Sequence, residues 1–219
     1  MEISALYHAD DDTARRLIIE TALDLVAKGI FAGTSGNISM RVEAGILITP
    51  SAVEYAELTP AAIQLIPFEG NPQETGKYKP TTEWRFHQAI YENETVNSVT
   101  HAHPICATAL AMLRQPIPAS HDMVAQFGGD DVPIVDYHPF RSSELARKIG
   151  MAMSHRTACL LAKRGAVTSG ANSKKAQSNM EELELLAHMH LTALSAGQPA
   201  VLSRSDMRVV LEKFSEYRG

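Results

Sequence analysis

Two histidines stand two residues apart in the segment SVTHAHPICATALA, which covers residues 98–111. The β-branched run before His101 and His103 predicts a short strand, on which residues i and i+2 point to the same face. A helix-forming run follows Pro104, so the pair stands where the strand ends, a usual place for chemistry in α/β proteins. Two neutral imidazoles side by side suit Zn²⁺ and similar ions. An isolated pair of this kind is more often a surface feature, so the interpretation needs further ligands and a substrate site.

Hydroxyl and amide side chains gather in three further segments. They are TSGNIS (34–39), ITPSAVEY (48–55) and PTTE (80–83). Gly36 lets a ligand approach the backbone, and the threonines of PTTE lie at an expected helix N-terminus, where free N–H groups favour an anion. Each segment alone is typical of a helix cap, whereas together the three could hold one phosphate. Glu83, which ends PTTE, is either a dipole-complementing residue or, near the histidines, a metal ligand or proton acceptor.

The surrounding pattern supplies elements that could position these residues. Helical and strand patterns are interspersed, which predicts an α/β protein, and short strand spacings favour a mixed or antiparallel sheet. Helices are expected at 15–28, 80–93, 142–154, 174–196 and 205–218. Strands are expected at 45–49, 62–68, 97–103, 132–137 and 157–163, with 165–167 continuing the last one.

Composition narrows the class of protein. The chain has 219 residues, 45% hydrophobic and 21% charged, which is ordinary for one globular domain over 1–219. A net charge of −5 gives no reason to expect nucleic acid or an anionic membrane as partner, and no apolar run is long enough to span a bilayer. Cys106 and Cys159 lie in apolar segments and indicate free thiols in a reducing compartment, so the expected location is the cytoplasm.

The motifs together resemble the class II aldolase/adducin family. GTSGNISMR (33–41), ITPSAVEY, KPTTEWRFH (79–87) and VTHAHPICATALA occur in the family's order and spacing, and the similarity continues to the terminal LEKFSEYRG. The resemblance implies a three-layer α/β/α sandwich with a mostly antiparallel central sheet. It also implies a homotetramer with intersubunit sites, and retro-aldol cleavage of a phosphorylated ketose to dihydroxyacetone phosphate and an aldehyde.

The resemblance assigns roles residue by residue. The acid/base role falls on Glu83, and the role of a mobile tyrosine that reaches a neighbouring site falls on Tyr217. Two of three zinc ligands fall on His101 and His103, so the implied cofactor is a divalent metal, with zinc as the first candidate. The implied phosphate-binding residues are Thr34, Asn37, Ser51, Thr81 and Thr82.

Three positions depart from the family pattern. The family's third metal histidine is Arg164 here, and a guanidinium stays protonated and has no lone pair to offer a metal. Weak or partial metal occupancy is therefore expected. Asp122 stands where the family has an intersubunit tyrosine, and Ala52 where it has the glycine after a phosphate loop.

Other chemistries and residues stay open at this point. Epimerisation, dehydration and decarboxylation could use the same enolate-stabilising site, and a metal-poor adducin-like binding or assembly module is the non-catalytic alternative. His87 is expected to pack within its helix or to support the site. The remaining candidates for a substitute ligand are expected to be surface or capping histidines: His121, His138, His155, His188 and His190.

Overall fold

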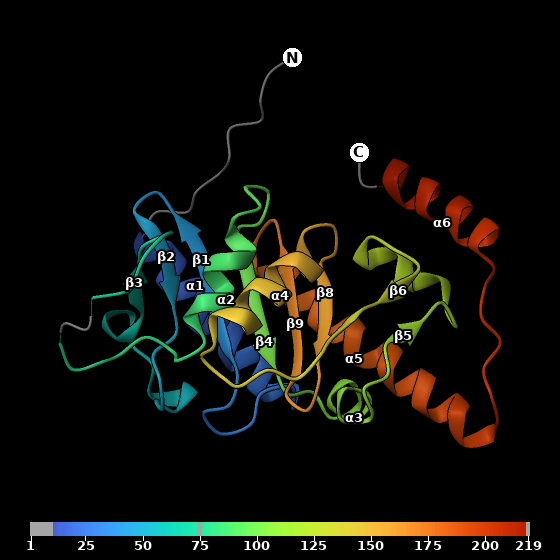
Figure 1. Cartoon of the computed structure of the whole chain (residues 1–219). Helices are drawn as coiled ribbons and strands as arrows, with labels where there is room; N and C mark the ends of the chain where they lie inside the picture. The colour runs from blue at the N-terminus through green and yellow to red at the C-terminus, as the bar shows by residue number, and fades with distance from the viewer. Residues whose placement is uncertain (1–10, 74–75, 218–219) are drawn as a thin grey trace, which may run out of the picture.

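A seven-stranded sheet runs through the molecule in the order β3–β2–β1–β4–β9–β8–β7 (Figure 1). The computed structural model describes residues 11–73 and 76–217, apart from the side chains of residues 215 and 217. Neighbouring strands are antiparallel except β7 and β8, which are parallel. The strands are β1 (Asn37–Val42), β2 (Gly45–Ile48), β3 (Gln64–Ile66), β4 (Ser98–Ala102), β7 (Ile134–Val135), β8 (Ala158–Leu161) and β9 (Gly165–Gly170); β5 (Ile117–Pro118) and β6 (Asp131–Val132) form a separate pair.

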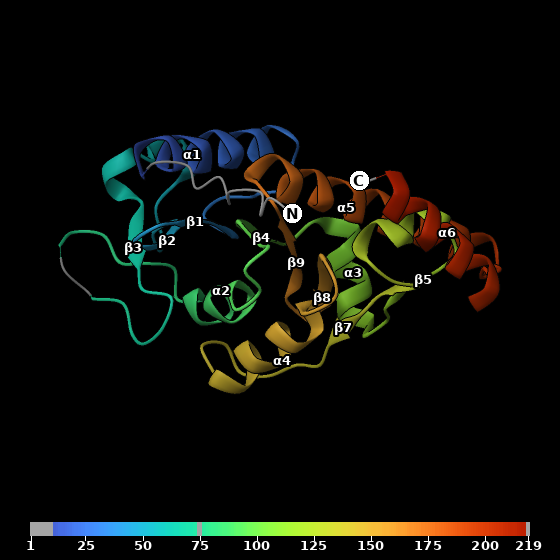
Figure 2. The ribbon, with the colours of Figure 1, turned by 90° about the horizontal axis from the view of Figure 1, so that it is seen from above.

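Helices cover both faces of the sheet, as Figure 2 shows from above. On one face lie α1 (Asp11–Ala27), α3 (Ile105–Leu113) and α5 (Ser173–Ala196), and on the other lie α2 (Trp84–Tyr91) and α4 (Ser143–Met153). Strand alternation divides the core accordingly, because Leu47 packs on the α1 side while Ile46 and Ile48 pack on the α2 side. The expected three-layer sandwich with a mostly antiparallel sheet is confirmed.

The short 3₁₀ helices and the C-terminal helix complete the fold. The 3₁₀ helices are η1 (Tyr55–Glu57), η2 (Pro60–Ala62) and η3 (Asp122–Phe127). The last helix, α6 (Arg204–Tyr217), packs on η3 at the edge of the molecule (Figure 1), with Met207 against Ala125. Within 11–73 and 76–217, no helix is both long and apolar enough to cross a membrane.

Two expected strands were wrong in their details. Segment 132–137 divides at Pro133, which has no N–H for a ladder: Val132 belongs to the small sheet and Ile134 to the large one. Segments 157–163 and 165–167 are two antiparallel strands, β8 and β9, and not one strand with a continuation. The chain reverses because Lys163 adopts a left-handed φ of +63° between them.

The starts of β1 and α2, both of which carry site residues, differ from the boundaries expected from the sequence. Segment 34–39 is a loop only to Gly36, and Asn37 already pairs with His101 in the ladder between β1 and β4. The helix expected from residue 80 begins at Trp84, because Pro80 forms an isolated bridge with Pro50 and Glu83 takes the N-cap position. The end of β4, the start of α2 and the turn between β8 and β9 therefore meet at one end of the sheet.

Candidate active site

The Glu83 carboxylate lies at the centre of this convergence. Its Oε1 accepts a hydrogen bond from Arg164 Nη1 at 2.6 Å, and its Oε2 accepts one from Asn37 Nδ2 at 2.9 Å. The same Oε2 lies 3.2 Å from Nε2 of His101. Only 14% of the Glu83 side chain and 19% of the Arg164 side chain is exposed. The ion pair is therefore shielded from water, which strengthens it relative to a surface pair.

Charged neighbours determine the proton affinity of this carboxylate. Burial alone would raise the pKa of Glu83, but His101, the Asn37 amide and Arg164 together outweigh burial and lower the pKa to about 2. The carboxylate is thus ionised at neutral pH. It is also a weak proton acceptor for as long as these partners hold it.

The two strand histidines stand side by side, as the sequence predicted. Nδ1 of His101 lies 2.9 Å from the carbonyl oxygen of Ala166, which can only accept, so Nδ1 carries the ring proton. Its Nε2 points at Nε2 of His103, 3.3 Å away, as well as at Glu83. Burial, with the neighbouring charges of His101 and Arg164, lowers the pKa of His103 to about 4, so that ring is neutral at pH 7. Electron pairs converge here, and a proton or a metal ion must lie between them.

The donor set fits a divalent metal only in part. Two imidazole nitrogens converge, and the bond from His101 to Ala166 fixes the ring orientation in the way that supporting bonds orient metal ligands. Among the described residues, however, no group of three or more His, Cys, Asp or Glu side chains could hold a metal ion. Arg164 lies against the carboxylate that would be the third ligand. These residues would hold a metal through His101 and His103, and weakly.

A series of buried side-chain hydrogen bonds holds Asn37 in place. Its Oδ1 lies 2.6 Å from Nε2 of His87, whose Nδ1 lies 2.7 Å from the Ser39 hydroxyl. That hydroxyl also lies 2.9 Å from the Tyr91 hydroxyl. His87, fully buried, therefore supports the site through Asn37, as expected. Ser39 and Tyr91 were missed, although Ser39 lies two residues after Asn37 on one strand and so shares its face.

A cavity of about 510 Å³ opens beside Glu83. All five residues assigned to phosphate binding line it, namely Thr34, Asn37, Ser51, Thr81 and Thr82, together with Glu83 and His103. Both hydrogens of the Asn37 amide are used by Glu83 and Thr81, so its side chain orients the carboxylate in this structure. Lys163 and Thr108 also line the cavity and were not anticipated; the adjacency of Lys163 to Arg164 was the available signal.

The remaining positions singled out in the sequence lie partly at the cavity and partly elsewhere. Ala52 lines the cavity in a left-handed conformation with φ of +57°, which agrees with the family having glycine there. Asp122 is in η3. Tyr217 ends α6, and its side chain lies outside the described residues. His121 caps η3, as expected. The expectation of a surface or capping role was wrong for His190, which is buried with its Nδ1 3.0 Å from the Ser120 hydroxyl. His138, His155 and His188 do not line the cavity at Glu83.

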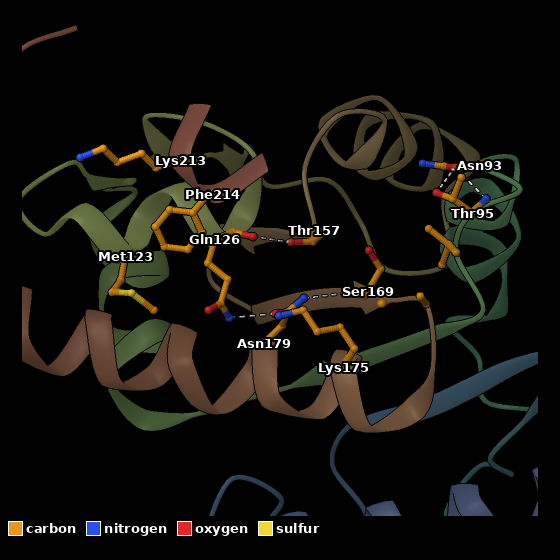
Figure 3. A pocket seen from close by; sticks show the side chains of 13 residues that line it. Asn93, Thr95, Met123, Gln126, Thr157, Ser169, Lys175, Asn179, Lys213 and Phe214 are labelled. Carbon is orange, nitrogen blue, oxygen red and sulfur yellow. Dashed lines mark hydrogen bonds between the residues drawn. The ribbon is translucent and has the colours of Figure 1, made fainter. Parts of the chain in front are cut away.

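A second cavity, of about 700 Å³, lies at the end of β9, where Ser169 and Gly170 line it. Figure 3 shows this cavity with Ser169 at its wall. Phe214 and Lys213 of α6 border it on one side, and Asn93 and Thr95 on the other. No His, Asp or Glu side chain is among the described residues that line it. Because neither a carboxylate nor an imidazole is among these residues, this larger cavity is a weaker candidate for catalysis than the one at Glu83.

The site at Glu83 thus combines a buried carboxylate, neighbouring imidazoles and a cavity lined with hydroxyl groups. Such a site suits proton transfer next to a bound anion. Comparison with known proteins defines the class. The model of the class II aldolase and adducin N-terminal domain matches residues 16–191.

Individual relatives cover almost the whole chain. An L-fuculose phosphate aldolase of Escherichia coli O6:H1 is 41% identical over 204 residues, covering 92% of this chain and 94% of the relative. A 5-methylthioribulose-1-phosphate/5-deoxyribulose-1-phosphate aldolase of Rhodospirillum rubrum is also 41% identical over 204 residues, covering 93% and 91%. A solved structure of L-fuculose 1-phosphate aldolase superposes with a TM-score of 0.87 at 32% identity, covering 97% of this chain and 100% of that one.

The chain belongs to the class II aldolase and adducin family. The two aldolases named above are each 41% identical to it over more than nine tenths of its length. The chain is therefore a class II aldolase-type carbon–carbon lyase.

Proposed function

We propose that this chain cleaves a phosphorylated ketose, of the fuculose 1-phosphate or 5-deoxyribulose 1-phosphate kind, into dihydroxyacetone phosphate and an aldehyde. The observation that carries the proposal is the buried Glu83 carboxylate beside His101 in a cavity lined by the three hydroxyl-rich segments. The named substrates of the relatives, all 1-phosphates or sugar phosphates, support the phosphate as the common anchor.

The residues of the chain divide the work between anchoring and proton transfer. Thr34, Ser51, Thr81 and Thr82 would hold the phosphate through their hydroxyl groups, so that remote binding energy positions the bond to be broken. Glu83 would take the proton of the C4 hydroxyl as the C3–C4 bond breaks, and would return it to C3. Asn37 would orient Glu83 for both steps.

A divalent metal, with zinc as the first candidate, would be held by His101 and His103. When bound, it would supply a Lewis acid that polarises the ketose carbonyl and stabilises negative charge on its oxygen. The partial fit of the donor set supports weak or partial occupancy. Tyr217 is proposed to reach a neighbouring site, in a homotetramer of single-domain chains over 1–219 that works in the cytoplasm.

A cleavage assay separates this proposal from its alternatives. Each phosphorylated ketose is incubated with the zinc-supplemented protein, and dihydroxyacetone phosphate is measured through its enzymatic reduction with NADH. We expect turnover with at least one ketose 1-phosphate. An epimerase, a dehydratase or a decarboxylase on the same site would consume its substrate without releasing dihydroxyacetone phosphate. A non-catalytic adducin-like module would leave every ketose unchanged.

A further inference from the structure

Electron-rich groups crowd the space between α2 and β4. Nε2 of His101 lies 3.2 Å from Oε2 of Glu83 and 3.3 Å from Nε2 of His103. The side chains of Glu83 and His101 are largely buried, so water screens their charge little, whereas His103 lies at the exposed side of the cluster. The cluster therefore favours a cation beside the Glu83 carboxylate.

A cation in contact with this carboxylate belongs to the chain itself. Arg164 follows Lys163 in the reverse turn between β8 and β9, where its backbone N–H donates to the Leu161 carbonyl at 2.9 Å. This turn aims the guanidinium at the carboxylate, with Nη1 2.6 Å from Oε1 of Glu83.

A guanidinium and a divalent metal cannot share this carboxylate without repulsion. Both are positive, and Arg164 has no lone pair with which to join the ligand set. We infer that Arg164 is the resident cation of the site and competes with a divalent metal for Glu83, so that metal enters only when the guanidinium swings away. The inference rests on the proposed metal binding by His101 and His103, and it does not require turnover.

Variants at the turn test the competition through metal affinity. Arg164→Gln removes the charge without adding a strong ligand, and Arg164→His removes the charge and adds an imidazole. Lys163→Gln is the matched control, because it removes the neighbouring charge, which forms neither a hydrogen bond nor an ion pair with Glu83. Zinc is titrated into metal-free protein in competition with a chromophoric chelator, and bound zinc per chain is measured by elemental analysis.

We expect Arg164→Gln to bind zinc at least tenfold more tightly than the unaltered chain, and Arg164→His more tightly again. Lys163→Gln should stay within about threefold of the unaltered chain. Tight stoichiometric zinc in the unaltered chain, or equal affinity in all four proteins, would overturn the inference. Thermal unfolding and far-UV circular dichroism of each variant identify any loss of fold, and a misfolded Arg164→Gln leaves Arg164→His to decide.

The outcome is distinguishable from failure of the proposed function. A protein without lyase activity whose affinity for zinc rises in both Arg164 variants refutes the proposed function and upholds the inference. An active lyase whose affinity for zinc is unchanged in both Arg164 variants upholds the proposed function and refutes the inference.

Discussion

At the scale of single residues, the buried polar side chains Asn37, Ser39 and His87 are hydrogen-bonded to one another, and these contacts define their state. His87 shows this clearly, because its Nε2 faces the Asn37 carbonyl oxygen and its Nδ1 faces the Ser39 hydroxyl. The ring is neutral with the proton on Nε2, since an amide oxygen can only accept. This tautomer leaves the Asn37 amide nitrogen free to donate to Glu83.

The burial of His87 predicts a dependence of stability on pH. Burial, reinforced by the neighbouring His101, lowers the pKa of His87 from 6.5 to about 3. Between these values the unfolded chain binds a proton that the folded chain excludes, so this contribution is complete above pH 6.5 and is lost as the pH falls toward 3. From pH 7.5 to 4.5, the cost from this one group should be about 2–3 kcal/mol.

Urea unfolding of the unaltered chain and of His87→Gln measures that cost at each pH. The variant should be less stable at pH 7.5, because it disturbs two buried hydrogen bonds, yet it should lose about 2–3 kcal/mol less stability on acidification. His188→Gln, which removes an exposed histidine of α5, should follow the unaltered chain. Parallel pH curves for all three proteins would refute the assigned state of His87.

At the scale of elements, the loop before β1 packs closely against the end of β4, and Gly36 makes this approach possible. Gly36 has a φ of +94°, and a Cβ there would lie 2.8 Å from the His101 carbonyl oxygen and 2.9 Å from the Phe31 ring. A side chain at this position would push the phosphate loop away from the end of β4. Gly33 also has a positive φ, +56°, but open space surrounds its missing Cβ.

These two glycines make a matched pair of substitutions. Gly33→Ala and Gly36→Ala both place alanine in a left-handed conformation, which costs about 1–2 kcal/mol. Gly36→Ala should cost a further 1–3 kcal/mol or so through its backbone clash, and should lower ketose cleavage more than Gly33→Ala does. Urea midpoints and cleavage rates of the two variants provide the measurement. Equal midpoints would show that the loop does not pack on β4 as described.

The elements were mostly predictable, and the failures have local causes. The histidine pair at the end of β4 followed from a period of two, and α1, α4, α5 and α6 followed from helical periodicity and capping residues. The break at Pro133 and the reversal at Lys163 were missed, because a run of apolar residues does not reveal where a strand changes its partner. Pattern alone could not pair Glu83 with Arg164, which are 81 residues apart in the chain.

At the scale of the whole molecule, the sheet brings the candidate residues to one end, where Asn37, Thr81 and His101 are buried while Thr34 and His103 are exposed. The hydroxyl-rich segments, distant in sequence, meet there because β1 pairs with β2 and Pro80 bridges Pro50, while the pairing of β1 with β4 brings His101 beside Asn37. The central claim is that Glu83 moves a proton to and from a carbon atom of a phosphate-anchored substrate.

Hydrogen exchange in dihydroxyacetone phosphate tests this claim most directly, because the half-reaction requires no knowledge of the aldehyde. The zinc-supplemented protein is incubated with dihydroxyacetone phosphate in D₂O, and deuterium at the hydroxymethyl carbon is followed by NMR. We expect the unaltered chain and Glu57→Gln, which changes an exposed carboxylate, to catalyse exchange at similar rates. Glu83→Gln should exchange about 10²–10⁴-fold more slowly. Equal rates with Glu83→Gln, or no exchange in the unaltered chain, would contradict the account.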